Sequence, residues 1–177
     1  MIEHRWLHNT KGKICKYEKN IDQILQIRKG DDFTFFVYGY MVPEAIKAAE
    51  ILREYSITID IFSMVNLSNK DFGQLFRSIE KTRNLVLIEC FTQDCALINN
   101  ISTEILKRKE IASNLDTFKT FALPDEHENT SFYKTKNRYV NYEKITKYVL
   151  KILGKDKILF KEKNFHDIPG DWFKGPF

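Results

Sequence analysis

The 177 residues of this chain are enough for one domain and leave no room for a second of ordinary size. Hydrophobic residues make up 43% and aromatic residues 14%, which excludes a disordered or collagen-like chain. The 28 Lys and Arg against 24 Asp and Glu give a net charge of +4, and these charges alternate in sign, so we expect no nucleic-acid partner. The longest apolar runs are well short of the roughly 18 residues that cross a bilayer, so we expect no membrane span.

The cysteine content argues against a secreted, disulfide-bonded protein. Cys15, Cys90 and Cys95 make an odd number, and no basic-plus-apolar signal stretch precedes them. The cytoplasm is therefore the expected compartment. The spacing of Cys90 and Cys95 matches neither a redox pair nor a closed metal site, so we interpret both as ordinary thiols.

Segments with strand character alternate with segments of helical periodicity from residue 33 onward. Residues 33–38 are β-branched or aromatic throughout, which is typical of a strand buried on both faces in a parallel sheet. Pro43 suits the first turn of the next helix, because its missing N–H would have no partner there. Ser68 or Asn69 is expected to cap a later helix. We expect strands at 33–38, 57–62, 85–88 and 117–121, and helices at 43–55, 70–80, 96–107 and 142–153.

This order of segments predicts an α/β fold with three layers, α/β/α, around a mostly parallel sheet. An antiparallel strand is expected at one edge of that sheet. Residues 1–7 hold one short possible strand, and the apolar residues 21–27 suit a strand or a helix equally well.

Open α/β sheets bind ligands beyond the carboxyl ends of their strands, so a loop site is expected there. Tyr40, Glu89 and His127 are the candidate residues of these loops. Gly39 stands alone, without the glycine-rich pattern of a phosphate-binding loop, and is interpreted as a tight-turn residue.

Other polar residues have plainer interpretations. Asp31 and Asp32 precede their strand, whereas a phosphoryl-accepting pair would follow one, so we interpret them as turn residues. Carboxylates beside His127 would raise its basicity, but no nucleophile for it to activate is identifiable, which favours an ordinary surface loop.

The spacing of several segments matches a known family. Residues 30–45 read GDDFTFFVYGYMVPEA, and AAEIL at 48–52, ITIDI at 57–61 and KTRNLVLIE at 81–89 follow in order. Together they resemble the carboxyl-terminal domain of the transketolase family. The resemblance is to the beta subunit of the thiamine-diphosphate-dependent decarboxylating component of 2-oxoacid dehydrogenases, of the pyruvate or acetoin type.

The resemblance implies that this chain does not hold the cofactor itself. In that family a glutamate of the preceding domain and a G-D-G motif bind thiamine diphosphate and Mg²⁺, and neither motif stands in this sequence. We therefore expect a non-catalytic assembly or dimerisation domain, with thiamine diphosphate and Mg²⁺ in the parent enzyme. The implied partners are a second copy (a homodimer contact), an alpha-type subunit, or the missing thiamine-diphosphate-binding domains.

The resemblance also suggests a division of the chain. Residues 1–20 would be the exit strand and linker of a missing pyrimidine-binding domain, residues 21–154 the transketolase carboxyl-terminal-like domain, and residues 155–177 a tail. The aromatic residues of the tail are expected to form an interface. They are Trp172, Phe173 and Phe177.

Two loops depart from the family pattern. Residues 89–95 have no Gly-Gly turn, and residues 125–129 read DEHEN in place of a proline-rich stretch. These departures indicate a divergent member whose substrate need not be pyruvate. The alternative function is a free-standing α/β ligand-binding or regulatory module that uses the loops after Gly39, Glu89 and Pro124.

Overall fold

A computed structural model describes residues 7, 24–68, 71–127, 130–131 and 138–155. Its centre is a five-stranded sheet with the strand order β1-β3-β2-β4-β5. The four strands β2 to β5 are parallel, and β1 pairs antiparallel with β3 at one edge. The predicted mostly parallel sheet with an antiparallel edge strand is therefore confirmed. The strands are β1 (Leu25–Arg28), β2 (Phe33–Val37), β3 (Ile59–Ser63), β4 (Asn84–Thr92) and β5 (Thr117–Leu123).

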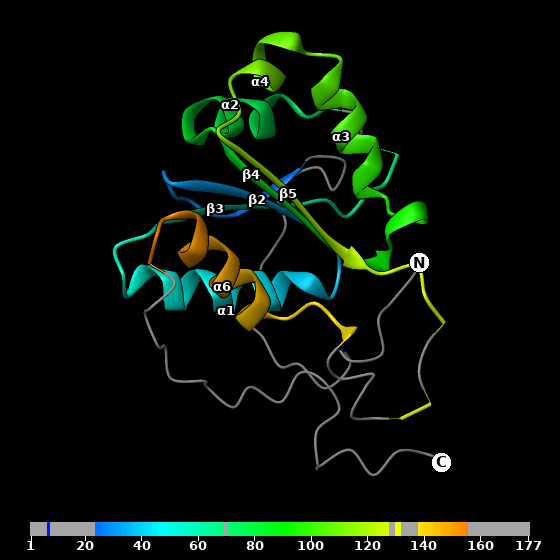
Figure 1. The fold of residues 1–177 in the computed structure, drawn as a ribbon. Coiled ribbons are helices and arrows are strands. Elements are labelled where there is room, and N and C mark those ends of the chain that lie inside the picture. Colours follow the sequence, from blue (N-terminus) through cyan, green and yellow to red (C-terminus); the bar gives the residue numbers. More distant parts are fainter. Residues whose placement is uncertain (1–6, 8–23, 69–70, 128–129, 132–137, 156–177) are drawn as a thin grey trace.

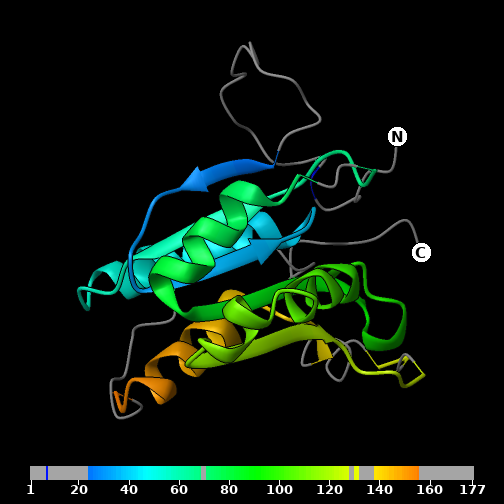
Figure 2. The same ribbon diagram turned by 90° about the horizontal axis from the view of Figure 1, so that it is seen from above.

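Helices cover both faces of this sheet and complete the predicted three layers (Figure 1). One face carries α1 (Met41–Arg53) and α6 (Tyr142–Ile152). The other carries α2 (Gly73–Thr82), α3 (Ile98–Leu106) and α4 (Lys109–Ser113). Figure 2 looks down on this second face, where α2, α3 and α4 lie over the strands.

The two faces of β2 belong to two different cores. Phe35 and Val37 pack under α1 and α6, whereas Phe36 packs under α2 and α3. All of β2 is buried, which confirms the prediction of a strand enclosed on both faces. Ala48 and Ala49 are buried on α1, and their small side chains let that helix lie close to the sheet.

The predicted start and cap of α2 were wrong. This helix begins at Gly73 instead of residue 70, and Phe72 stands before it without a side-chain cap. Ser68 does not cap it, because its backbone N–H donates to the Asn66 side chain in a separate turn (2.9 Å). The side chain of Asp71 instead accepts the N–H of Gly73 at 3.0 Å. Asn69 lies outside the described residues.

Other segments differ from the expectation in length. The strand expected at 85–88 continues to Thr92, and the short helix α4 was not predicted. The ambiguous stretch at 21–27 contributes strand β1 from Leu25 onward. Of the possible strand at 1–7, only Leu7 is described, and it packs against the core under α1 and α6.

A buried hydrogen-bond network lies at the amino end of the sheet. Its centre is Asp60 of β3, a carboxylate that is 1% exposed. One carboxylate oxygen accepts from Gln26 Nε2 of β1 at 2.7 Å, and the other accepts from Ser78 Oγ of α2 at 2.6 Å. Lys81 Nζ lies 3.5 Å from the second oxygen. Asp60 thus joins the edge strand, the sheet and the covering helix.

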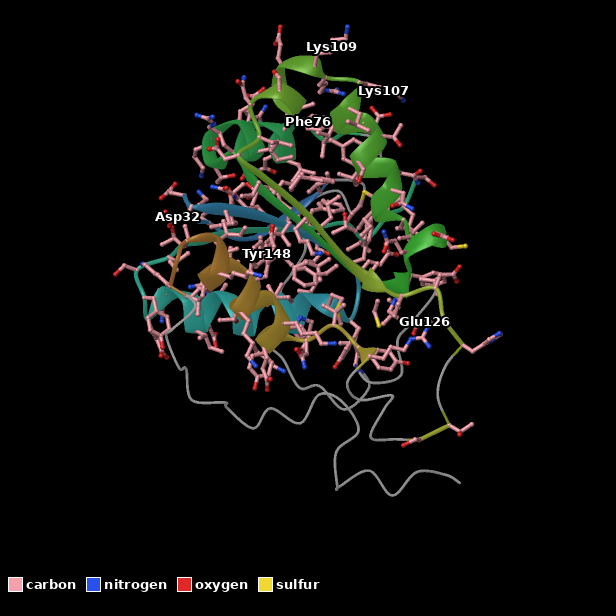
Figure 3. All side chains as sticks on the ribbon, viewed as in Figure 1. Asp32, Phe76, Lys107, Lys109, Glu126 and Tyr148 are labelled. Carbon is pink, nitrogen blue, oxygen red and sulfur yellow. The ribbon has the colours of Figure 1, made fainter. Side chains whose placement is uncertain are left out.

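The turn before β2 uses its two aspartates structurally, as predicted. Asp32 accepts hydrogen bonds from the backbone N–H and the hydroxyl of Thr58, both at 2.7 Å. Asp31 forms an exposed ion pair with Lys81 at 3.1 Å. Figure 3 shows Asp32 and Glu126 at opposite ends of the sheet, so this pair lies far from the carboxyl-end loops.

Candidate functional site

The sheet reverses its direction of winding between β2 and β4. After β2 the chain enters α1 on one face, and after β4 it enters α3 on the other face. In open α/β sheets this switch point, at the carboxyl ends of the strands, is where ligands bind. The Tyr38–Tyr40 turn after β2 and Glu89 in the second half of β4 flank it, so we take this edge as the candidate site.

Glu44 is a buried carboxylate on the α1 side of this edge. It stands in the first turn of α1 and is 2% exposed. Its Oε2 accepts the backbone N–H of Tyr142 at 2.8 Å, and its Oε1 accepts from Lys47 Nζ at 3.2 Å. Burial lowers the pKa of Lys47, although Glu44 opposes that change. Glu44 therefore ties the start of α1 to the start of α6.

Tyr40 lies beside this carboxylate in the α1 and α6 core. Burial raises the pKa of its phenol, and the nearby Glu44 and Cys90 raise it further. The hydroxyl of Tyr40 is consequently protonated at any physiological pH. It can donate a hydrogen bond but cannot act as a base.

Glu89 is the matching buried carboxylate on the α3 side. Its Oε2 accepts the backbone N–H of Ile98, the first residue of α3, at 3.0 Å. Burial raises the pKa of Glu89, while the N–H groups of Ile98 and Leu97 act in the opposite direction. Because a negative charge is stabilising near the amino terminus of a helix, Glu89 stabilises the first turn of α3. A short 3₁₀ helix at Gln93–Cys95 completes the turn without the Gly-Gly pair.

The buried carboxyl of Glu89 should make stability depend on pH. A carboxyl whose folded-state pKa lies above its ordinary 4.5 stabilises the fold at low pH, and this contribution is lost as pH rises through the folded pKa. Glu89→Gln keeps an oxygen for Ile98 but does not titrate. We expect the free energy of unfolding of E89Q, relative to wild type, to increase between pH 4 and pH 7. Urea titrations at several pH values measure this difference, and a constant difference would contradict the role assigned to Glu89.

The three candidate loop residues come from different parts of the fold. Tyr40 belongs to the α1 face and Glu89 to the α3 face. His127 is exposed in the loop that follows β5 and comes directly after Glu126, which Figure 3 labels. Arg138 holds that loop by donating from Nη2 to the backbone oxygens of Pro124 (2.8 Å) and Glu126. A loop site formed by Tyr40, Glu89 and His127 stays a prediction.

Metal binding has no support in the part of the chain that is described. There, no three His, Cys, Asp or Glu residues are grouped so that they could hold an ion. Cys90 is half-buried and Cys95 exposed, and neither forms a disulfide with a described residue.

No described helix is long and apolar enough to cross a membrane. The tail residues Trp172, Phe173 and Phe177 lie outside the described residues.

Sequence reasoning missed Glu44 and Arg138. The role of each residue depends on a hydrogen-bond partner from another segment of the chain. Glu44 and its partner Tyr142, for example, are separated by 98 positions. The only signal in the sequence was a carboxylate directly after Pro43 in an otherwise apolar helix start.

The mostly parallel sheet and the two helical layers define a three-layer α/β domain. The chain belongs to the family described as the transketolase, C-terminal domain, whose family model matches residues 22–140. This confirms the resemblance drawn from residues 30–89.

Individual relatives agree with this assignment. The acetoin:2,6-dichlorophenolindophenol oxidoreductase subunit beta of Cupriavidus necator is 27% identical over 108 residues, which is 60% of this chain and 32% of that protein. The pyruvate dehydrogenase E1 component subunit beta of Bacillus subtilis is 28% identical over 81 residues, which is 46% of this chain and 25% of that protein. The chain therefore spans about a third or less of the length of these relatives.

A solved structure supports the fold. A split gene transketolase, an inactive beta4 tetramer, matches with a TM-score of 0.58 at 17% identity. The match covers 80% of this chain and 45% of that chain.

Proposed function

We propose that this chain is the carboxyl-terminal assembly domain of a thiamine-diphosphate-dependent enzyme of the transketolase or 2-oxoacid dehydrogenase type. In this proposal the chain is not catalytic by itself. The observation that carries it is the extent of the match: the chain belongs to a carboxyl-terminal domain family and covers only 32% of the acetoin oxidoreductase beta subunit.

The chemistry of the candidate site supports a structural role. The two buried carboxylates at the switch point are engaged by the backbone of the chain, Glu44 by Tyr142 and Glu89 by Ile98. Each carboxylate accepts the backbone N–H at the start of a helix, so each contributes to a helix connection. These groups hold the shape of the edge, which is what an assembly domain requires.

The described residues do not fit a magnesium diphosphate site. Mg²⁺ in such sites is held by carboxylates together with phosphate oxygens. The described carboxylates are not grouped for that purpose, and the turn after β2 has one glycine in place of a phosphate-binding loop. Thiamine diphosphate and Mg²⁺ therefore belong, in this proposal, to the domains or subunit with which the chain assembles. The candidate partners are a second copy, an alpha-type subunit or the thiamine-diphosphate-binding domains.

A pull-down combined with calorimetry tests this proposal. An affinity-tagged full chain, expressed in its own cells, is expected to retain a polypeptide with a G-D-G motif in a fixed ratio. The complex should bind thiamine diphosphate with Mg²⁺, and the isolated chain should show no saturable heat. A stoichiometric micromolar site on the isolated chain would overturn the non-catalytic role. Recovery of the chain without any such polypeptide would overturn the assembly role.

The aromatic tail stays a prediction, and the same pull-down examines it. If Trp172, Phe173 and Phe177 form the subunit contact, deleting residues 165–177 removes the partner and leaves the melting temperature unchanged. A lower melting temperature with the partner retained would instead place the tail on its own domain.

A further inference from the structure

A pocket of about 340 Å³ opens on the α3 side of the candidate site. Its lining comes from Tyr38 at the end of β2, from the segment after β3 and from one face of α3. Figure 1 shows α2 and α3 on the same face of the sheet. The pocket lies between helix α3 and the segment that leads into α2. It therefore stands at the carboxyl ends of parallel strands, where open α/β sheets take their ligands.

The size of the pocket suits a small organic molecule. Ligand pockets usually measure roughly 300 to 1,000 Å³. A cavity of roughly 150 Å³ holds benzene, so this pocket has room for a substituted ring or a branched chain of about ten non-hydrogen atoms.

The inner wall of the pocket is apolar. Met64 and Phe72 line it from the segment between β3 and α2, and Leu97 and Ile101 line it from α3. Met64, Phe72 and Ile101 are buried, so these side chains are held by the core and cannot easily fill the space themselves. This wall would bind an apolar body by removing it from water.

Tyr38 supplies a hydrogen-bond donor to the same space. The residue is 9% exposed, and its ring makes an edge-on contact with Phe36, with ring centroids 5.1 Å apart. No described residue accepts a hydrogen bond from its hydroxyl in the structure. Burial, together with the nearby Glu89, raises the pKa of this phenol, so the group remains an O–H donor. Because this hydroxyl has no acceptor among the described residues and belongs to a residue that lines the pocket, a ligand that brings an acceptor is favoured over one that does not.

The two charged residues that line the pocket form an ion pair. Lys107 Nζ lies 2.7 Å from Glu104 Oε1. A charged ligand would have to displace one of these partners. An uncharged ligand enters without that cost.

We propose that this pocket binds a small uncharged molecule in which an apolar ring or branched chain carries a carbonyl or similar hydrogen-bond acceptor. The acceptor faces the hydroxyl of Tyr38, and the apolar body lies against Met64 and Ile101. This binding site is additional to the assembly role and does not depend on it.

Two probes of similar size separate the acceptor from the apolar body. Acetophenone has a ring and a carbonyl, whereas ethylbenzene has the ring alone. Titration of the ¹⁵N-labelled full chain is expected to give saturable shifts at the amides of α3 with both probes. Tyr38→Phe should weaken acetophenone about 3- to 10-fold, the value of one hydrogen bond, and leave ethylbenzene unchanged.

A blocking variant locates the binding site. Asn100 lines the pocket on α3, so Asn100→Trp should fill it and abolish the shifts with both probes. Asn99→Trp places the same ring next to it on the helix, outside the pocket lining, and should leave both probes bound. Melting temperatures show that each variant is folded.

Unsaturable shifts, or binding that survives Asn100→Trp in a folded protein, would overturn the pocket as a binding site. Equal weakening of both probes by Tyr38→Phe would overturn the assignment of its hydroxyl as the donor to the ligand.

Discussion

Replacing Asp60 with alanine is expected to lower the free energy of unfolding by about 3 kcal/mol, because it leaves buried donors without an acceptor. Gln26 Nε2 and Ser78 Oγ both donate to this carboxylate, at 2.7 and 2.6 Å. Ser78 is also joined to Thr34 of β2 at 2.8 Å, so the loss reaches the central strand. Urea unfolding of the full chain measures the change.

The exposed neighbour Asp31 provides the matched control. It forms an ion pair with Lys81 at 3.1 Å, but its side chain is 83% exposed. Surface pairs of this kind contribute little, so Asp31→Ala should change stability by less than about 0.5 kcal/mol. Asp60→Asn keeps the shape of the side chain but replaces the oxygen that faces Ser78 with an amide donor. Its loss of stability should lie between those of D31A and D60A. Equal effects of D31A and D60A would show that the buried network does not stabilise the fold.

The order of strands and helices could be predicted because each buried strand is a continuous apolar or β-branched run. Residues 33–38 illustrate this, since both of their faces are enclosed by helices. Helix starts were less predictable. The start of α2 depends on the turn that Asn66 and Asp71 form with the backbone, and two polar residues, Ser68 and Asn69, looked equally suitable as caps.

The candidate site could be placed but not described from the sequence. The carboxyl ends of β2 and β4 follow from the strand order, which explains why Tyr40 and Glu89 lie at the switch point. The sequence could not show on which face of the sheet Tyr40 and Glu89 lie. One reason is that β4 extends to Thr92 and that the register between β4 and β5 shifts after Ile88. The pocket under α3 could not be found either, since its lining comes from three segments separated along the chain.

Asp60 shows what a sequence pattern can still suggest. It stands between Ile59 and Ile61 in a strand whose residues are all buried. A carboxylate at such a position must have partners, because burying it alone would cost several kcal/mol. The partners Gln26 and Ser78 come from segments on either side of β3 in the chain, so their identity required the structure.

Gly30→Ala is expected to destabilise the fold by about 3 kcal/mol, because a side chain at this position would overlap the neighbouring backbone. A Cβ on Gly30 would lie 2.6 Å from the carbonyl oxygen of Ile59 and closer still to its nitrogen and carbonyl carbon. The turn cannot easily move away. Two hydrogen bonds hold the turn. Asp32 accepts the backbone N–H of Thr58 at 2.7 Å, and Lys81 Nζ donates to the carbonyl of Gly30 at 2.7 Å.

Gly73→Ala is the control for this last variant. Gly73 is the first residue of α2, and a Cβ there would meet only the ends of two side chains, Asp71 at 3.3 Å and Arg77 at 3.8 Å. Alanine favours helix over glycine, so G73A should be neutral or more stable by up to about 1 kcal/mol. For a chain of this size, G30A should lower the melting temperature by roughly 6 to 12 °C, which calorimetry resolves from the control. If G30A melted like G73A, the close approach of the turn to β3 would be wrong. If the expected loss is found, the glycine of the G-D-D segment that carried the family resemblance is required by backbone packing.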